Sequence, residues 1–193
     1  MDYLERMKEY YERRAAEYDG AYLGTGAYSG RDRPGFGEEL ARVVTLVEGL
    51  PPARVLDVGC GTGFMTRHLK GEVVGLDQSA AMLRIAQGRV PGASFVRGDA
   101  LSLPFPDGAF GRAFVGNLLG VLPPPERAAL VREARRVASA ARHQVEPTVD
   151  RPATERPSSC CCPDLAANPP TYSRSDDGGE PVANPARRSA VIG

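Results

Sequence analysis

The chain has 193 residues, a length that suits one domain with a hydrophobic core. Its 24 basic and 24 acidic side chains balance, so no charge excess points to nucleic acid as a partner. The N-terminus is charged, and no apolar run reaches the length of a membrane span. These features favour a cytoplasmic protein that acts on a small molecule, without nucleic acid or membrane as a partner.

The four cysteines indicate neither a disulfide framework nor a metal site. Cys60 lies in a glycine-rich segment, and the other three, Cys160 to Cys162, are consecutive. Consecutive cysteines are poorly placed for tetrahedral metal coordination, and they do not show the spacing of a disulfide-stabilised fold. We therefore expect no metal and no disulfide.

The first predicted element is an amphipathic helix over about residues 2–18. One face collects most of its large side chains, namely Tyr3, Met7, Tyr10, Tyr11, Arg14 and Tyr18. Such a stripe is explained by packing on the domain or by a lid that closes over a ligand. A second helix is predicted from Phe36 to just before Gly49, because apolar residues recur there at helical spacing.

Strand-like and helical segments then alternate along the chain. Apolar runs at 53–58, 72–76, 93–97 and 111–115 read as strands, and residues 63–70 and 79–87 between them read as helices. A further helix is predicted over about 125–138. This alternation is typical of an α/β fold with a doubly wound parallel sheet.

The first predicted strand runs into three glycines at alternate positions. Residues 55–63 read Val-Leu-Asp-Val-Gly-Cys-Gly-Thr-Gly, which places glycine at 59, 61 and 63. Glycine tolerates positive φ and lets the backbone approach a bound molecule closely. Asp77 follows Asp57 by twenty positions, at the end of the next strand, where an acid commonly binds ribose hydroxyls. The segment therefore predicts a nucleotide site.

The glycine spacing distinguishes among nucleotide sites. A dinucleotide fingerprint would carry a small residue where Phe64 stands, and a P-loop would carry Gly-Lys-Ser or Gly-Lys-Thr. The nonapeptide and its surroundings instead resemble the first motif of class I S-adenosylmethionine-dependent methyltransferases, over roughly residues 10–138. This resemblance implies a Rossmann-like sheet, S-adenosylmethionine as cofactor and a small-molecule methyl acceptor. A nicotinamide oxidoreductase is the disfavoured alternative.

The resemblance also implies which residues contact the cofactor. They are Tyr18, Asp57, Gly59, Cys60, Gly61, Gly63, Asp77, Gln78, Met82, Asp99, Ala100 and Asn117. Asp57 and the glycines would border the methionine part, Asp77 the ribose, Asp99 the adenine amino group and Asn117 the methionine ammonium. No catalytic residue is nominated, because the sulfonium leaving group is already activated and alignment is the main requirement.

Each of these polar residues also has a purely structural explanation. Asp57 could orient the glycine loop, Asp77 and Asp99 could be turn residues, and Asn117 could cap a helix. Met82 could simply belong to the core. The cofactor interpretation depends on all of them converging on one edge of the sheet.

The predicted domain boundaries are 1–35 for an N-terminal helical lid, 36–138 for the cofactor-binding core and 139–193 for a low-complexity tail. The tail has eight prolines but only six Leu, Ile, Val and Phe residues together, so we expect disorder. The last strands of the family fold are not recognisable. The strand at 111–115 would then be an exposed edge that invites self-association.

The origin of this tail has two explanations. It is a shifted reading frame after about Ala138, or it is a natural extension. Because the tail stands where the family fold continues, a second functional hypothesis accompanies the first. The chain is an active methyltransferase, or it is a truncated remnant that binds the cofactor without catalysis.

Overall fold

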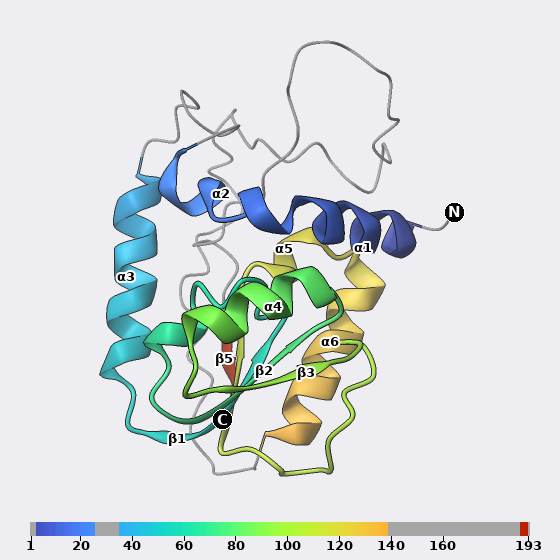
Figure 1. Cartoon of the computed structure of the whole chain (residues 1–193). Coiled ribbons are helices and arrows are strands. Elements are labelled where there is room, and N and C mark those ends of the chain that lie inside the picture. Colours follow the sequence, from blue (N-terminus) through green and yellow to red (C-terminus); the bar gives the residue numbers. More distant parts are fainter. Residues whose placement is uncertain (1–2, 26–34, 139–189, 193) are drawn as a thin grey trace, which may run out of the picture.

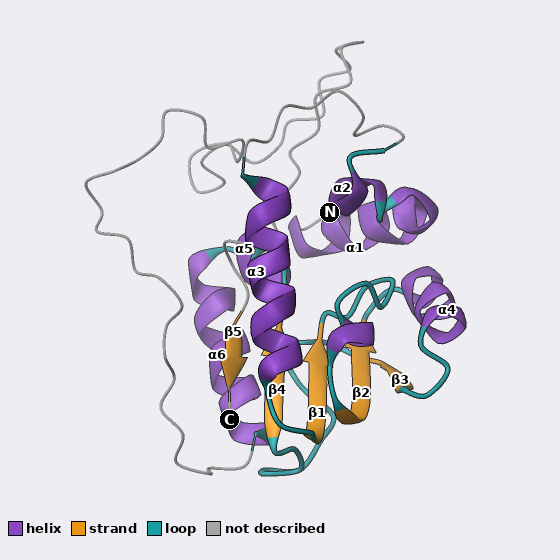
Figure 2. Cartoon of the chain, turned by 90° about the vertical axis from the view of Figure 1, so that its left-hand side faces the viewer, coloured by secondary structure: helices purple, strands orange, loops and turns teal. Residues whose placement is uncertain are grey.

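The computed structural model describes residues 3–25, 35–138 and 190–192. Its centre is a β-sheet (Figure 1), and Figure 2 shows the strands in the order β3-β2-β1-β4-β5. The strands are β1 (Ala53–Val58), β2 (Gly71–Asp77), β3 (Ser94–Arg97), β4 (Arg112–Val115) and β5 (Ala190–Ile192). The first four are mutually parallel, which confirms the predicted parallel sheet, and each lies within about a residue of its predicted range.

The edge of the sheet beside β4 differs from the expectation. β5 pairs with β4 in antiparallel register, with Phe114 opposite Val191 and Ala113 opposite Ile192. The described sheet therefore has one strand more than the sequence indicated, and β4 is not an exposed edge. The reason for expecting self-association at this edge is removed. The remainder of the predicted tail, 139–189 and 193, lies outside the described residues.

Helices cover the sheet and its carboxyl end. Those that follow residue 35 are α3 (Phe36–Gly49), α4 (Ala80–Arg89), α5 (Leu118–Val121) and α6 (Pro124–Val137). The segment predicted as a lid, for which we keep that name, contains α1 (Tyr3–Arg14), the 3-10 turn η1 (Ala15–Glu17) and α2 (Gly20–Leu23). In Figure 2 the arrows of β1 and β2 point toward α1 and α2. None of the helices in the described ranges combines the length and apolar character that a membrane crossing requires.

The helix predicted at 63–70 is wrong. Only a 3-10 turn, η3 (Thr66–His68), forms in this region. Gly63 has φ +74°, outside the helical range, and a Cβ at this position would lie 3.2 Å from Cα of Ala86 in α4. The loop after β1 is therefore an extended glycine turn that packs closely against α4, and apolar spacing alone does not reveal this.

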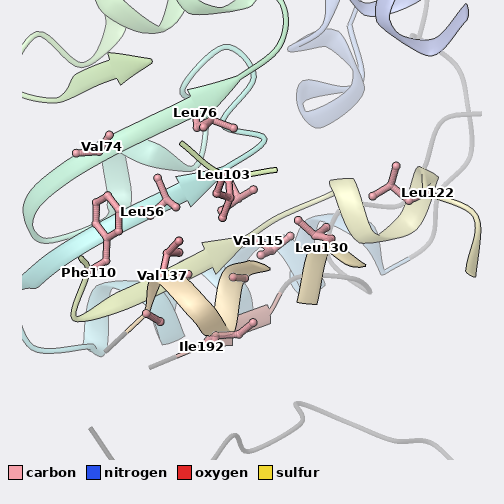
Figure 3. Close-up of a cluster of buried hydrophobic side chains, with 14 residues drawn as sticks. Leu56, Val74, Leu76, Leu103, Phe110, Val115, Leu122, Leu130, Val137 and Ile192 are labelled. Atoms are coloured by element: carbon pink, nitrogen blue, oxygen red, sulfur yellow. The ribbon is translucent and has the colours of Figure 1, made fainter. Parts of the chain in front are cut away.

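The alternation of side chains along the strands fills two separate layers. From β1, Leu56 and Val58 enter a core that includes Leu130 and Val137 of α6, together with Ile192 (Figure 3). On the opposite face, Val55 joins a second cluster with Val47 of α3, Phe64, Met65 and Phe114. Burial of both faces explains why the strands read as nearly continuous apolar runs. It also holds the carboxyl ends of β1 and β4 in fixed positions.

Candidate functional site

A cleft lies at the carboxyl ends of the strands, where the strand order changes direction. β1 pairs with β2 on one side and with β4 on the other, and an α/β sheet binds its ligands at such a point. The cleft is lined by the strand ends and by the lid helices. All of the predicted site residues line it except Gly63, which packs against α4 instead.

Asp57 is the next-to-last residue of β1 and is 1% exposed. Its Oδ2 accepts a hydrogen bond of 2.7 Å from the hydroxyl of Thr66. Burial raises the pKa of Asp57 to about 7, the Thr66 hydrogen bond opposes this shift, and the charge of Asp77 adds to it. The side chain therefore both orients the loop that follows and places a titratable carboxyl in the cleft.

Asp77 ends β2 and holds the glycine loop. Its Oδ2 accepts a 2.9 Å hydrogen bond from the backbone N–H of Gly61, and its Oδ1 accepts one of 2.9 Å from Ser79. Burial raises the pKa of Asp77, although these backbone hydrogen bonds oppose the shift. A carboxylate has about four lone-pair sites, so each oxygen keeps acceptor capacity for a ligand hydroxyl.

The glycine loop is shaped for close approach of a ligand. Gly61 has φ +53°, and a Cβ there would lie 3.5 Å from the ring of Tyr18 in the lid. The backbone N–H groups of Gly59 and Cys60 both donate to the carbonyl of Leu76, which ties the loop to β2. Burial raises the pKa of the Cys60 thiol, so this side chain is protonated at neutral pH and is not a nucleophile.

The end of β3 contributes a turn. Oδ1 of Asp99 accepts a 2.8 Å hydrogen bond from the backbone N–H of Leu101, so Asp99 does act as a turn residue while it also lines the cleft. Ala100 and Gln78 line the same side, together with Met82, which is 2% exposed. The structural and the ligand-binding explanations of Asp99 are therefore compatible.

Asn117 follows β4 and presents an unsatisfied oxygen. Its Nδ2 donates a 2.9 Å hydrogen bond to the hydroxyl of Tyr22. Its Oδ1 is buried and accepts no hydrogen bond from the described part of the chain. Although Asn117 precedes α5, its side chain makes no capping bond. A buried acceptor without a partner is costly, and a ligand donor in the cleft would satisfy it.

The lid contributes a ladder of aromatic rings. Tyr10, Tyr11, Tyr18 and Tyr22 meet edge to face, with successive centroids 5.2, 5.8 and 5.9 Å apart. Tyr22 stacks on Phe64 of the glycine loop at 4.1 Å. The four tyrosine rings come from the lid, and they line the cleft together with Phe64. Sequence reasoning missed Tyr22, which lies in α2, whereas Tyr18 follows the preceding 3-10 turn η1.

Three further residues were missed because they are far apart in the sequence. Asp19, Thr62 and Arg89 come from the lid, the glycine loop and α4, and they form one polar network. No periodicity or motif connects these positions. Within the described residues, no three His, Cys, Asp or Glu side chains gather closely enough to hold a metal ion.

The sequence is similar to known methyltransferases. The profile of a family described as a methyltransferase domain matches residues 55–140. A demethylmenaquinone methyltransferase of Thermotoga maritima is 41% identical over 101 residues, which are 50% of this chain and 43% of that protein. The chain thus spans less than half the length of this relative.

Solved methyltransferase structures share the fold of this chain. An S-adenosylmethionine-dependent methyltransferase of Thermotoga maritima, described as a possible histamine N-methyltransferase, is 30% identical with a TM-score of 0.52, over 69% of this chain and 57% of that one. The DhpI-SAM-HEP complex is 26% identical with a TM-score of 0.57, over 70% and 61%. The second of these holds S-adenosylmethionine.

Proposed function

We infer that this chain, whose residues 55–140 form a class I S-adenosylmethionine-dependent methyltransferase domain, transfers the methyl group of that cofactor to a small-molecule acceptor. One observation carries the inference. The ends of four parallel strands deliver Asp57, Asp77, Asp99 and Asn117 into a single cleft beside a glycine loop. A nicotinamide cofactor is not supported, because the glycine spacing of that fingerprint is absent.

The residues present fit S-adenosylmethionine. The unpaired Oδ1 of Asn117 can accept a hydrogen bond from its ammonium group, and Asp77 has acceptor capacity for ribose hydroxyls. Three carboxyl groups line the cleft, which complements a ligand with two positive groups and one negative group. We propose all twelve sequence-predicted residues as its site, with Gly63 acting only by shaping the loop.

The chemistry requires alignment and exclusion of water. S-adenosylmethionine supplies a methyl group on a positively charged sulfur, so the leaving group needs no acid from the protein. The chain closes the cleft with the tyrosine ladder of the lid, which keeps competing water away. Holding the acceptor in line with the methyl group then accounts for most of the acceleration.

The lining of the cleft favours an apolar or aromatic acceptor. On the lid side the lining consists of Leu4, Met7 and the tyrosines, together with the charged side chain of Arg14. α5 adds Leu118 and Val121. The carboxyl groups all lie at the strand ends, so the lid side offers no acid to pair with an amine. A quinone-type acceptor, as in the name of the demethylmenaquinone methyltransferase relative, has this character. A cytoplasmic location and the absence of a nucleic acid partner remain part of this proposal.

Calorimetry tests cofactor binding. Replacing Asp77 with Ala is expected to weaken S-adenosylmethionine binding by about 1.5–3 kcal/mol, the scale of a lost charge-assisted hydrogen bond. Glu72→Ala is the matched control, because Glu72 is an exposed carboxylate at the opposite end of the same strand. Equal affinities for the two variants would remove Asp77 from the site.

A second assay separates catalysis from binding alone. The alternative function is a remnant that binds the cofactor without catalysing methyl transfer. Methyl-labelled S-adenosylmethionine is incubated with quinols, phenols and small amines. Transfer to an aromatic acceptor supports the enzyme, whereas binding without transfer to any acceptor supports the remnant.

A further inference from the structure

Asp19 connects the lid to the glycine loop and to α4. It lies between η1 and α2, and its Oδ1 accepts a 2.5 Å hydrogen bond from the hydroxyl of Thr62. Its Oδ2 forms an ion pair with Arg89. The side chains of Asp19 and Arg89 are only 21% and 24% exposed, so the pair is partly shielded from water. Such a charge-assisted pair is stronger than one on an open surface.

Arg89 completes the network. Its Nη1 donates hydrogen bonds of 3.0 Å to both the hydroxyl and the carbonyl oxygen of Thr62. Thr62 is 1% exposed and directly follows Gly61, whose N–H donates to Asp77. A continuous chain of hydrogen bonds and one peptide unit therefore joins the ribose-site carboxylate, the glycine loop, α4 and the lid.

The network also fixes an aromatic ring at the cleft. Tyr18 immediately precedes Asp19, and its ring lies against Gly61. Two other hydrogen bonds attach α1 to the rest of the molecule at points away from the glycine loop. The hydroxyl of Tyr3 donates to the carbonyl of Val121, and the carboxylate of Glu12 accepts from the backbone N–H of Ala81. Neither of them touches the glycine loop. Asp19 is thus placed to couple the position of Tyr18 to the conformation of that loop.

We propose that Asp19 is a positioning residue that, through Thr62 and Arg89, holds the lid closed over the cofactor and sets how long S-adenosylmethionine and its product S-adenosylhomocysteine stay bound. This step depends on the proposed function. It goes beyond that function because it proposes that Asp19, Thr62 and Arg89, which do not line the acceptor side of the cleft, control how fast the ligand is exchanged. Variants of one binding site usually change the dissociation rate more than the association rate, so loss of the cluster should appear mainly as faster dissociation.

The test measures dissociation of S-adenosylhomocysteine by stopped flow. The chain has no tryptophan, so the tyrosines of the lid report directly. Asp19→Ala is expected to raise the dissociation rate roughly tenfold, the effect of losing about one charge-assisted hydrogen bond. Asp19→Asn, which keeps an acceptor for Thr62 but loses the charge, should lie between wild type and Asp19→Ala. Arg84→Ala, an exposed arginine on the same helix, should leave the rate unchanged.

The Thr62 hydroxyl is tested separately in case Asp19→Ala does not fold. Thr62→Val removes the hydroxyl at nearly constant volume and should speed dissociation, whereas Thr62→Ser should restore the wild-type rate. Hydrogen exchange at residues 15–25 should rise in Thr62→Val with S-adenosylhomocysteine bound. A merely structural role would change the melting temperature without changing exchange at the lid in the bound state.

The outcomes separate the two proposals. If wild-type protein does not bind S-adenosylhomocysteine, the proposed function fails. If the wild-type protein binds S-adenosylhomocysteine but Asp19→Asn and Thr62→Val both release it as slowly as wild type does, the function stands and the role of Asp19 is overturned.

Discussion

Asp57 and Asp77 lie at the carboxyl ends of adjacent parallel strands and line the same cleft, and the charge of Asp77 adds to burial in raising the pKa of Asp57 to about 7. The free protein therefore holds a proton at Asp57 that an ordinary aspartate would have released. A cation bound between these carboxyls favours their ionised forms and lowers both pKa values. Ligand binding and proton release are linked in consequence.

The affinity for S-adenosylmethionine should rise with pH. Between about pH 5.5 and about pH 7.5 we expect a gain of roughly tenfold, accompanied by proton release. S-adenosylhomocysteine, which lacks the positive sulfur, is the matched ligand and should respond less. Calorimetry in two buffers of different ionisation enthalpy measures the protons released. Identical pH profiles for the two ligands would contradict a role of the carboxyl pair in recognising the sulfonium.

The stability of the free protein should fall as pH rises, whereas its affinity for S-adenosylmethionine rises. The pKa of Asp57 is raised in the folded state above the ordinary 3.8, so its contribution to stability is full below about pH 4 and is lost as pH rises through about 7. Asp57→Asn keeps an acceptor for the Thr66 hydroxyl and removes the charge. It should raise the free energy of unfolding by about 1–3 kcal/mol at alkaline pH and weaken S-adenosylmethionine binding. Urea titrations near pH 4 and pH 8 measure this, and an equal change at both would refute it.

Asn117 and Tyr22 can be separated by a pair of variants. Tyr22→Phe removes the hydroxyl that accepts from Nδ2, whereas Asn117→Ala also removes the unpaired Oδ1. We expect Asn117→Ala to weaken S-adenosylmethionine binding by about 1–2 kcal/mol more than Tyr22→Phe does. If both variants bind with the same affinity, Oδ1 has no role in holding the ammonium group.

The glycine loop should not accept a branched side chain. Gly61→Val places a side chain at φ +53° against the ring of Tyr18, so S-adenosylmethionine binding should be abolished and stability lowered by about 1–2 kcal/mol. Gly88→Val is the matched control, because Gly88 lies in α4 with open space around it. Calorimetry and thermal unfolding give both quantities, and retained binding in Gly61→Val would refute the cradle.

The fifth strand can be tested through its buried side chain. Ile192 is 7% exposed and belongs to the core between the sheet and α6. Ile192→Ala should lower the free energy of unfolding by about 2 kcal/mol or more, as for other large-to-small core substitutions. Leu46→Ala, at an exposed position on α3, should change it little. Equal stability of both variants in urea would place Ile192 outside the folded core.

The strands, the glycine loop and the cleft residues were predictable because each leaves a local signal. β1 and β2 are apolar runs that carry Asp57 and Asp77 at their carboxyl ends, and adjacent parallel strands bring those ends together. The 3-10 turn at Thr66 was not predictable, because close packing of Gly63 on α4 overrides the apolar spacing.

β5 and the cluster of Asp19, Thr62 and Arg89 left no local signal in the sequence. β5 is only three residues long, too short to show periodicity, and it stands in a segment poor in apolar residues. Asp19, Thr62 and Arg89 meet only after the lid, the loop and α4 have been placed in space. Contacts of this kind depend on tertiary structure and leave no pattern in the sequence.

The pairing of β5 with β4 also has a kinetic consequence. β1, β2 and β3 follow one another closely in the chain, whereas Phe114 must find Val191 across a long intervening segment. Closing that long loop costs more entropy and slows the pairing, so we expect β5 to dock last during folding and to open first in the native state. During that interval the apolar edge of β4 is available to other chains, and newly made protein is most prone to aggregate then.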